Sequence, residues 1–411
     1  MADRFQAPRG TADVLPAESA ARARIERVAR SLLERAGYAR IETPVFEDTE
    51  LFARGVGGST DIVRKEMFTF EDKGGRSITL RPEATASICR AYLEHGMQKL
   101  AQPVKLWWYG SLFRHERPQA GRFRQFTQLD AEVIGSDSPL VDAELITLCD
   151  EFLRTVGVPE LTLRIGSLGS PEARASYREE LIAYLREHES ELDRDVRDRI
   201  DENPLRAFDS KDESTQAVMA GAPTMLDRLE GGDAEHFAAV RRLLDQAGVD
   251  YEVDGRLVRG LDYYTRTVFE FHSARLGAQS QVAGGGRYDR LIELLGGPPT
   301  PANGWAAGIE RILLAIEAPE EQQPQDVFVA AEDSQRERAL ALVTELRRAG
   351  LRADLDLAGR SMKGQMRQAD RTGAGHALIL DADGSIQLRD MRSGEQREVE
   401  AARVVEELSA G

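Results

Sequence analysis

Two long segments with the pattern of β-strands, separated by a short loop, constrain the fold of this chain more than any other feature. The segments cover residues 104–113 and 123–134, and the loop HERPQAGR between them contains the proline and glycine typical of turns. Side chains alternate between the two faces of a strand. In the second segment one face is apolar, and the other carries Gln128, Asp130 and Glu132. The pattern predicts an antiparallel hairpin whose polar face either meets solvent or lines a charged cleft.

The first fifty residues predict a helix followed by a short strand. Apolar side chains, among them Ile25 and Leu32, recur at helical spacing over residues 17–36. The sequence RIETPVF at 40–46 then predicts a strand that Pro44 confines to a sheet edge or a break, because proline cannot donate a ladder hydrogen bond. Such an edge is either a dimer surface or a strand covered by its own chain.

Charged residues occupy two further positions that need an explanation. Residues 76–80 predict a strand, and the RPEAT that follows opens a helix over 84–93. Glu83 would lie at the N-terminal end of this helix, where a carboxylate either caps the first turn or serves a binding site. From Gly304, the sequence GWAAGIERILLAIEA predicts a helix buried on both sides. Arg311 in that helix requires an anion, which is either an ion-pair partner or a bound phosphate.

A tyrosine-rich stretch and a glycine-rich stretch interrupt the last strands of this region. LVRGLDYYTRTVFEF at 257–271 has a strand pattern broken by an arginine and two tyrosines, which indicates the floor of a small-molecule site. GGGRYD at 284–289 suits a bulge, a turn or the close approach of a ligand.

Length and composition favour a soluble protein of several domains. The 411 residues, 41% of them hydrophobic, predict two or three domains. No apolar run approaches the roughly 18 residues of a membrane span, and the first ten residues lack the apolar stretch of a signal peptide. We therefore expect a cytoplasmic protein with no membrane partner. Cys89 and Cys149 are isolated in the sequence, which predicts buried thiols and neither a disulfide nor a zinc site.

The charge of the chain is unevenly distributed. Residues 171–256 hold 22 acidic and 12 basic side chains, which is −10 of the formal net charge of −16, and they predict a helical insertion over about 170–255. Residues 112–124 are locally basic. A polar segment with two prolines at 317–325 predicts a linker. Alternating strands and helices over 326–411 then predict a small α/β domain.

A basic stripe marks the second helix of this C-terminal domain. Lys363, Arg367 and Arg371 are spaced at i, i+4 and i+8, so they share one face of the helix. The stripe suits a phosphate backbone or, alternatively, a solvated helix face.

Several of these segments together resemble a known family. FRHERPQAGRFRQFTQLDAEVIG resembles the second signature motif of the class II aminoacyl-tRNA synthetases in its histidyl form, and GWAAGIERILL resembles the third. The segment from the first helix through RIETPVF is similar to the first motif. LVRGLDYYTRTVFEF and AGGGRYDRLI resemble the two stretches that distinguish histidyl-tRNA synthetases from their relatives. With RPEAT and the C-terminal domain, the resemblance covers essentially the whole chain.

The resemblance implies a fold and a reaction. The implied fold is α+β, with a class II catalytic core of antiparallel sheet flanked by helices over 1–320, the helical insertion at about 170–255, and an α/β anticodon-binding domain at 326–411. The family forms homodimers through the first motif. The implied reaction joins histidine to ATP, giving histidyl-adenylate and pyrophosphate, and then transfers histidine to the 3′ end of its tRNA. Magnesium accompanies the ATP, and no zinc or other protein-bound metal is expected.

The resemblance also implies roles for individual residues. Arginine suits a reaction between two anions because it stays charged and donates two parallel hydrogen bonds. By their positions in the motifs, Arg114, Glu116 and Arg311 would bind ATP, and Arg259 would bridge the histidine carboxylate and the α-phosphate; Arg114, Arg259 and Arg311 are the expected catalytic residues. The expected histidine-binding residues are Glu83, Thr85, Gln128, Glu132, Arg259, Tyr263 and Tyr264. The expected tRNA-binding residues are Arg122, Lys363, Arg367 and Arg371.

Two other functions compete with this one. A regulatory subunit of ATP phosphoribosyltransferase shares the core but lacks the anticodon-binding domain and degrades the RGLDYY stretch. A tRNA-sensing module of the kind fused to kinases would bring a kinase-like sequence, which is missing here. Ala84 and Ala120 depart from the family motifs, the first at a common glycine and the second at a position that is often basic. Strict strand alternation would separate Arg259 from Tyr264, so we expect a bend or break near residues 261–263.

Overall fold

The computed structural model of the chain divides it into two compact units, Met1–Glu320 and Glu321–Gly411. It describes residues 5–58, 60, 62–116, 121–277, 279–316 and 324–409. Most of the predicted linker at 317–325 and the departure at Ala120 lie outside the described residues. Among the helices that the structure does describe, none is long and apolar enough to cross a membrane.

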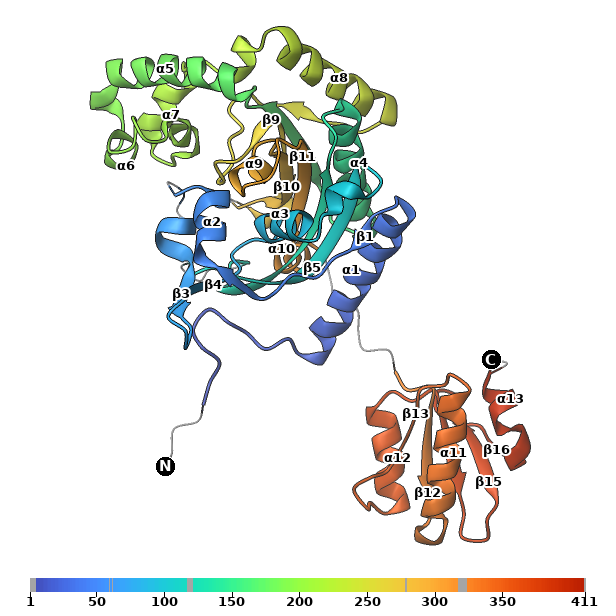
Figure 1. The fold of residues 1–411 in the computed structure, drawn as a ribbon. Helices are drawn as coiled ribbons and strands as arrows, with labels where there is room; N and C mark the ends of the chain where they lie inside the picture. Colours follow the sequence, from blue (N-terminus) through green and yellow to red (C-terminus); the bar gives the residue numbers. More distant parts are fainter. Residues whose placement is uncertain are drawn as a thin grey trace. The chain divides into compact units, whose positions relative to one another are not determined.

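An eight-stranded sheet forms the centre of the first unit (Figure 1). Its strand order is β1-β5-β6-β11-β10-β9-β7-β8, and neighbours are antiparallel except for the pairs β1 with β5 and β7 with β8 at the two edges. The antiparallel sheet is thus confirmed, with the predicted hairpin at its heart as β5 and β6. The strands are β1 (Ala39–Arg40), β5 (Val104–Phe113), β6 (Gln125–Ile134), β7 (Leu161–Ser167), β8 (Glu252–Val253), β9 (Thr265–Ser273), β10 (Gln281–Arg287) and β11 (Ala302–Gly308).

Helices cover both faces of this sheet. The first face packs against α1 (Pro16–Arg35), α4 (Pro139–Val156), α8 (Gly231–Ala247) and α10 (Ile309–Ala315). The helix predicted at 17–36 is therefore confirmed as α1, and its Ile25 is fully buried. The second face packs against α3 (Thr85–Glu94) and α9 (Leu291–Leu294). Cys89 on α3 and Cys149 on α4 are buried free thiols, as predicted.

The alternation along β6 determines which face carries polar groups. Leu129 and its apolar neighbours on β6 are fully buried in the core beneath α1 and α4. The intervening side chains therefore point to the α3 side of the sheet. There Asp130 and Glu132 are each 1% exposed. The possibility of a solvated polar face is wrong, because these two carboxylates lie inside the protein.

A small second sheet accompanies the first. It has the order β2-β4-β3 and lies beside helix α2. The single strand predicted over 40–46 is wrong, because the chain leaves β1 at Arg40, passes Pro44 without ladder hydrogen bonds and forms a new strand from Phe46. Phe46 is 52% exposed, so this edge is not covered by its own chain. The elements are β2 (Phe46–Asp48), α2 (Thr49–Val56), β3 (Phe68–Glu71) and β4 (Ser77–Leu80).

The segment between β7 and β8 is helical, as the sequence predicted, but it has two parts. Its first part is a lobe that lies beside the sheet (Figure 1) and has its own core around Tyr177 and Leu181. Its last helix, α8, instead places Val240 and Leu244 in the core of the main sheet. The lobe contains α5 (Pro171–Glu187), α6 (Arg194–Arg197) and α7 (Glu213–Ala220).

Two predictions in the last third of the first unit have opposite outcomes. The helix predicted from Gly304 is wrong in its start, because residues up to Gly308 form β11 and the helix begins at Ile309. A short apolar run with small residues does not distinguish a buried strand from a buried helix. The break predicted near residues 261–263 is confirmed, since regular strand structure in that stretch begins at Thr265.

The second unit is the small α/β domain that the sequence predicted. Its sheet has the order β13-β12-β14-β15-β16, with parallel pairing around β12 and antiparallel pairing from β14 onward. Helices α11 and α12 cover opposite faces, since α11 packs on Val327 and Val329 and α12 on Phe328 and Ala330. The last two strands and α13 were not predicted, because polar turns divide them. The elements are β12 (Val327–Ala331), α11 (Arg336–Arg348), β13 (Ala353–Leu355), α12 (Met362–Arg371), β14 (His376–Leu380), β15 (Ile386–Asp390), β16 (Gln396–Glu398) and α13 (Val404–Ser409).

Candidate active site

A buried carboxylate on β6 connects three elements on the α3 side of the main sheet. One oxygen of Glu132 accepts a hydrogen bond from the Thr85 hydroxyl at the start of α3, at 2.7 Å. The other accepts one from the Tyr288 hydroxyl, just after β10, at 2.5 Å. Burial raises the pKa of Glu132 to about 8, although both hydrogen bonds favour its charged form. The group is therefore held in place by neutral donors and has no cation bound to it directly.

Glu83 provides a second buried carboxylate in the same region. Its Oε1 accepts the backbone N–H of Ala86 at 2.9 Å, so the capping role considered for it is confirmed. Its Oε2 is buried without a hydrogen-bond partner among the described residues. Burial raises the pKa of Glu83 to about 7, against the nearby charge of Arg114. One oxygen thus caps the helix, and the other remains available to a ligand.

Asp130 adds a third acidic group. It lies two residues before Glu132 on the same face of β6, and its Oδ2 also lacks a partner among the described residues. Burial and the neighbouring carboxylates Glu132 and Glu83 raise its pKa well above the usual range. Three carboxyl groups buried this closely favour binding of a cation.

A glycine on the neighbouring strand makes space for Glu132. Gly304 of β11 lies opposite Glu132 in the strand register. A Cβ at residue 304 would lie 1.6 Å from Glu132 Oε2, which no side chain can do. The glycine of this motif is therefore required by the close approach of a carboxylate.

The stretch between Leu257 and β9 supplies a buried arginine and two tyrosines. The Arg259 guanidinium forms an ion pair with Glu270 of β9 and lies 5.4 Å from the centre of the Tyr264 ring. Its Nε has no hydrogen-bond partner among the described residues. Tyr263 and Tyr264 are buried, and their rings lie 4.8 Å apart. The break before β9 thus brings Arg259 and Tyr264 together.

A glycine is also required beside Arg259. A Cβ at Gly284, the first of the three glycines in β10, would lie 2.8 Å from Arg259 Nη1 and 2.7 Å from Gln281 Nε2. The open alternatives for the glycine-rich stretch are resolved here, since the register also shifts between Gly286 and Arg287. The stretch therefore combines a bulge with the close approach of side chains.

Arg114 lies between these groups and the hairpin loop. It follows β5 directly, donates through Nε to the carbonyl of Pro82 at 2.8 Å, and lies over the ring of Phe126 at 5.3 Å. The carbonyl that it binds belongs to the residue before Glu83. Arg114 is partly buried, and its charge is close enough to act on the Glu83 carboxyl.

Arg311 lies at the other end of the site, on α10. Its guanidinium donates to the carbonyl oxygens of Gln281 and Gln279. Burial and the nearby charge of Arg122 lower its pKa, while the more favourable charge of Glu116 acts in the opposite sense. The bonds of Arg311 within the described residues are to carbonyl oxygens and not to a carboxylate. The ion-pair explanation for its charge is therefore not supported, and the phosphate explanation remains.

Glu116 and Arg122 belong to the hairpin loop, where they pair with each other at 3.2 Å. Residues 117–120 between them are outside the described residues. Gln128, two residues before Asp130 on the same face of β6, is half-buried and lies opposite Gly110 and Gly308 in the strand register.

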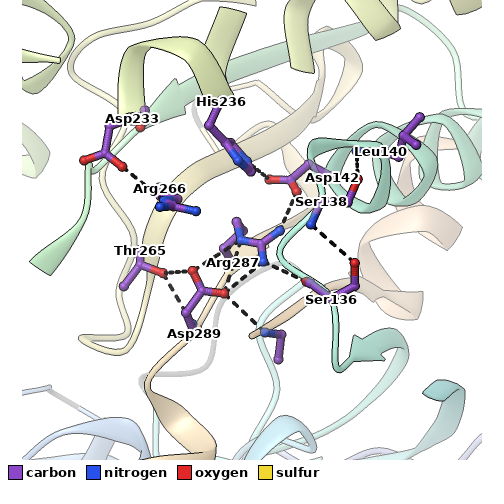
Figure 2. A network of polar contacts seen from close by, with 12 residues as sticks. Ser136, Ser138, Leu140, Asp142, Asp233, His236, Thr265, Arg266, Arg287 and Asp289 are labelled. Atoms are coloured by element: carbon purple, nitrogen blue, oxygen red, sulfur yellow. Dashed lines mark hydrogen bonds and ion pairs between the residues drawn. The ribbon is translucent and has the colours of Figure 1, made fainter. Parts of the chain in front are cut away.

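A buried ionic network that the sequence did not predict surrounds Arg287, as Figure 2 shows. Arg287 is fully buried and donates to Asp142 of α4 at 2.7 Å and to Asp289 at 3.0 Å. The other oxygen of Asp289 accepts the Thr265 hydroxyl at 3.2 Å. Asp142 also bonds His236 of α8 at 3.2 Å. The AGGGRYD motif contained two of these residues, but only their partners, distant in sequence, reveal the network.

The structure thus brings most of the expected residues into one region of the first unit. The charges of Glu83, Glu132, Tyr263 and Tyr264 are close enough to act on one another, and Thr85 donates to Glu132. The basic stripe instead lies exposed on α12 in the second unit. Among the described residues, no group of three or more histidine, cysteine, aspartate or glutamate side chains could hold a metal ion.

Three features together define a class II aminoacyl-tRNA synthetase. They are an antiparallel sheet with a strand-loop-strand hairpin, a buried set of carboxylates near arginines, and a helix bearing Arg311. Comparison with known families refines this assignment. The family model described as histidyl-tRNA synthetase matches residues 10–312, and the model described as anticodon binding domain matches residues 325–410. The chain therefore belongs to the histidyl-tRNA synthetase family.

Individual relatives agree with this assignment. A histidine-tRNA ligase of Rubrobacter xylanophilus is 51% identical over 409 residues, which covers 96% of each chain. One of Halorhodospira halophila is 48% identical and covers 96% of this chain and 95% of the relative. The crystal structure of apo S. aureus histidyl-tRNA synthetase has a TM-score of 0.82 and 36% identity, covering 98% of this chain and 100% of that one.

The raised pKa of Glu132 predicts a particular dependence of stability on pH. Between pH 5 and 8 the unfolded carboxyl is ionised while the folded one holds its proton, so the free energy of unfolding falls as pH rises. Glu132→Gln removes this term. Between pH 5 and pH 8, the free energy of unfolding of the variant should therefore rise relative to that of the wild type by at least about 1.4 kcal/mol, the equivalent of one pKa unit. Urea titration followed by tryptophan fluorescence measures it, because all three tryptophans lie in the first unit.

Glu151→Gln on the exposed side of α4 is the matched control, and it should change stability equally at both pH values. A constant difference between wild type and Glu132→Gln across this range would contradict the raised pKa.

Proposed function

We propose that the chain is a histidine-tRNA ligase. It activates histidine with ATP to form histidyl-adenylate and pyrophosphate, and it then transfers histidine to the 3′ end of its tRNA. The observation that carries the proposal is the set of buried acceptors at Glu83 and Glu132 beside the arginines Arg114 and Arg259. This set offers complementary charge to an amino acid that carries an ammonium, a carboxylate and an imidazole.

The ammonium and the imidazole have separate acceptors in this assignment. Glu83, Thr85 and Gln128 bind the amino group, and the free oxygen of Glu83 supports this because it is buried and unpaired. An ammonium beside Glu83 would hold that carboxyl in its charged form despite its raised pKa. Glu132 and Tyr264, with Tyr263 packed beside them, bind the imidazole nitrogens. A site built for two ring nitrogens rejects isosteres that lack them, because its own polar groups would stay unpaired.

The arginines bind the anionic groups. Arg259 bridges the histidine carboxylate and the α-phosphate of ATP, while Arg114 and Arg311 hold the phosphates together with Glu116. The histidine carboxylate is itself the nucleophile, so the protein needs no nucleophilic side chain. Negative charge grows on the phosphate oxygens as the carboxylate attacks, and fixed cations stabilise it. The reaction is then accelerated mainly by positioning the two substrates.

Magnesium would arrive with ATP. Mg²⁺ usually keeps several waters and binds substrate phosphates with one or two carboxylates, so it does not require a cage of protein ligands. Its contribution is to neutralise phosphate charge, and Glu116 is the acidic side chain nearest to Arg311 that could share this task.

The regulatory-subunit alternative is less well supported. The anticodon-binding model covers the second unit, and the RGLDYY stretch is intact with Arg259 and Tyr264 in contact. A structure described as a Bacillus halodurans ATP phosphoribosyltransferase regulatory subunit/histidyl-tRNA synthetase shares the fold at 23% identity with a TM-score of 0.69. At that identity, similarity speaks for the fold alone. The proposed ligase acts in the cytoplasm, where tRNA is charged.

The first experiment is ATP–pyrophosphate exchange with each amino acid. Exchange should require histidine, and Arg259→Ala should lower its turnover at least a hundredfold, because the variant lacks the cation between the two reacting anions. Arg256→Ala, an exposed arginine three residues earlier, is the control and should keep full activity. Binding of ATP without histidine-dependent exchange by the wild type would instead favour the regulatory function. Unchanged turnover of a folded Arg259→Ala protein would exclude the role of Arg259.

The basic stripe on α12 is proposed to bind the tRNA backbone, and Arg122 to bind its acceptor end. Lys363→Ala combined with Arg367→Ala should weaken tRNA binding and lower the slope of log affinity against log salt by roughly 1.4 to 1.8, since each lost phosphate contact contributes about 0.7 to 0.9. Adenylate formation should not change. Filter binding at several salt concentrations measures the slope.

Arg338→Ala with Arg348→Ala on α11 is the control pair, because α11 covers the opposite face of the same sheet. Equal weakening by both pairs would show that overall charge, and not the α12 face, determines tRNA binding.

The small sheet is proposed as part of a homodimer interface. Phe46 on β2 and Phe70 on β3 lie on the two outer strands of this sheet and are 52% and 46% exposed, which is unusual for two phenylalanines of one small sheet in a monomer. Phe46→Glu should shift the protein from dimer toward monomer in sedimentation velocity at micromolar concentration. Leu340→Glu, which changes a similarly exposed residue on α11, should leave the dimer intact. A monomeric wild type would refute the interface.

A further inference from the structure

The residues that precede β9 have no ladder hydrogen bonds to the main sheet, although Leu257, Tyr263 and Tyr264 pack in its core. Residues 257–264 lie outside any strand, and regular pairing of β9 begins at Thr265. The loop nevertheless has to keep Tyr263 and Tyr264 buried and Arg259 against Glu270. Contacts from the helical insertion provide further support.

Arg174, in the first turns of α5, binds the loop through its backbone. Its Nη1 donates to the carbonyl oxygen of Tyr264 at 3.0 Å and, more weakly, to that of Asp262 at 3.5 Å. Arg174 is half-buried, and this partial removal from water lowers the pKa of its guanidinium. Because one guanidinium donates to two carbonyl oxygens of the same loop, it fixes the path of the backbone between them.

Two further contacts from the same insertion hold the loop on either side. Asn203 donates to the carboxylate of Asp262 at 3.3 Å. Asp233 of α8 accepts from the Arg266 guanidinium at 3.0 Å and from the backbone N–H of Ser170 at 2.8 Å (Figure 2). Arg266 has φ = 47°, a left-handed conformation that is unfavourable for a residue with a side chain. Its contact with Asp233, together with backbone hydrogen bonds to Gly169 and Leu168, stabilises this residue of β9 in that conformation.

The space behind the two tyrosines is incompletely filled. A cavity of about 380 Å³ lies between the loop and the insertion, and its walls include Arg174, Asn203, Tyr263 and Tyr264. Close packing alone therefore does not determine where the rear of the loop lies. Hydrogen bonds add the remaining constraint: Arg174 donates to the carbonyl oxygens of Tyr264 and Asp262, and the Asp262 N–H donates to the carbonyl oxygen of Val56 at 3.3 Å.

We propose that Arg174 is a positioning residue for histidine binding, which acts from the helical insertion by holding the backbone at Tyr264 so that the tyrosine side chain faces the pocket. This inference rests on the proposed role of Tyr264 in reading the imidazole. It gives the insertion a part in the first step of the reaction, in addition to any contact with tRNA.

The test is steady-state pyrophosphate exchange by Arg174→Met, which keeps the length of the side chain and removes its donors. KM for histidine should rise roughly tenfold, as expected for loss of a charge-assisted hydrogen bond, while KM for ATP stays within twofold. Arg174→Lys keeps one donor and should recover part of the loss. Arg178→Met is the control: it lies one turn further along α5, lines the same cavity, and donates to backbone carbonyls at Asp201 and Glu202 inside the insertion. It should leave both KM values unchanged.

A double-mutant cycle with Tyr264→Phe separates positioning from general damage. If Arg174 acts through Tyr264, KM for histidine should be no higher in the double variant than in the more impaired single variant. Once residue 264 lacks its hydroxyl, displacing it removes no further contact. Effects that multiply, or an equal rise in KM for ATP, would overturn the inference. An unchanged KM for Tyr264→Phe alone would instead refute the proposed histidine site. If Arg174→Met keeps the wild-type KM for histidine while Tyr264→Phe raises it, the inference about Arg174 is refuted and the proposed histidine site is not.

Discussion

Burial of the Glu132 carboxylate inside the main sheet is the constraint on which the first unit depends. A carboxyl group at this depth is costly unless donors meet its oxygens, and for Glu132 the donors come from Thr85 on α3 and Tyr288 after β10. Gly304 on β11 provides the room that a side chain would take. The hydrogen bonds and the space that the Glu132 carboxylate requires therefore link the positions of α3, β6, β11 and the loop after β10. Because burial raises its pKa to about 8, this carboxyl group lowers the free energy of unfolding as pH rises toward that value.

In the network around Arg287, side chains of opposite charge pair with one another inside the protein. Glu132, in contrast, is bonded by neutral hydroxyl groups. Arg287 lies between Asp142 and Asp289, which keeps its pKa raised and that of Asp142 lowered despite their burial. A buried ion group of this kind adds little net stability, but removal of one member leaves an unpaired charge. Its use here is geometric: Asp289 fixes Thr265, and Asp142 connects to α8 through His236. The same few side chains thus link the start of β9 to two helices distant in sequence.

The sequence predicted those features that depend on local pattern, and missed those that depend on partners. The hairpin of β5 and β6, helix α1 and the break before β9 followed from alternation, periodicity and the need to bring Arg259 to Tyr264. The start of α10 was wrong because alanine and glycine fit a buried strand and a buried helix equally well. The network of Asp142, Arg287 and Asp289 was missed because 145 residues separate the first two, and no spacing rule connects them. Most candidate site residues came from motif resemblance, whereas the free oxygens of Glu83 and Asp130 required the structure.

The arginines Arg259 and Arg311 differ in their electrostatic state. Arg259 is already paired with Glu270, which His272 also contacts, so its net local charge is small and its pKa is raised. Arg311 binds carbonyl oxygens, which neutralise no charge, and Arg122 is close enough to lower its pKa further. A guanidinium fixed by a carboxylate is well suited to orient an incoming anion. One bonded to neutral carbonyl oxygens keeps its full charge, which is the state that the proposed phosphate-binding role of Arg311 requires. We infer that the paired Arg259 offers less unscreened charge than Arg311, so that raising ionic strength should weaken ATP binding more than histidine binding.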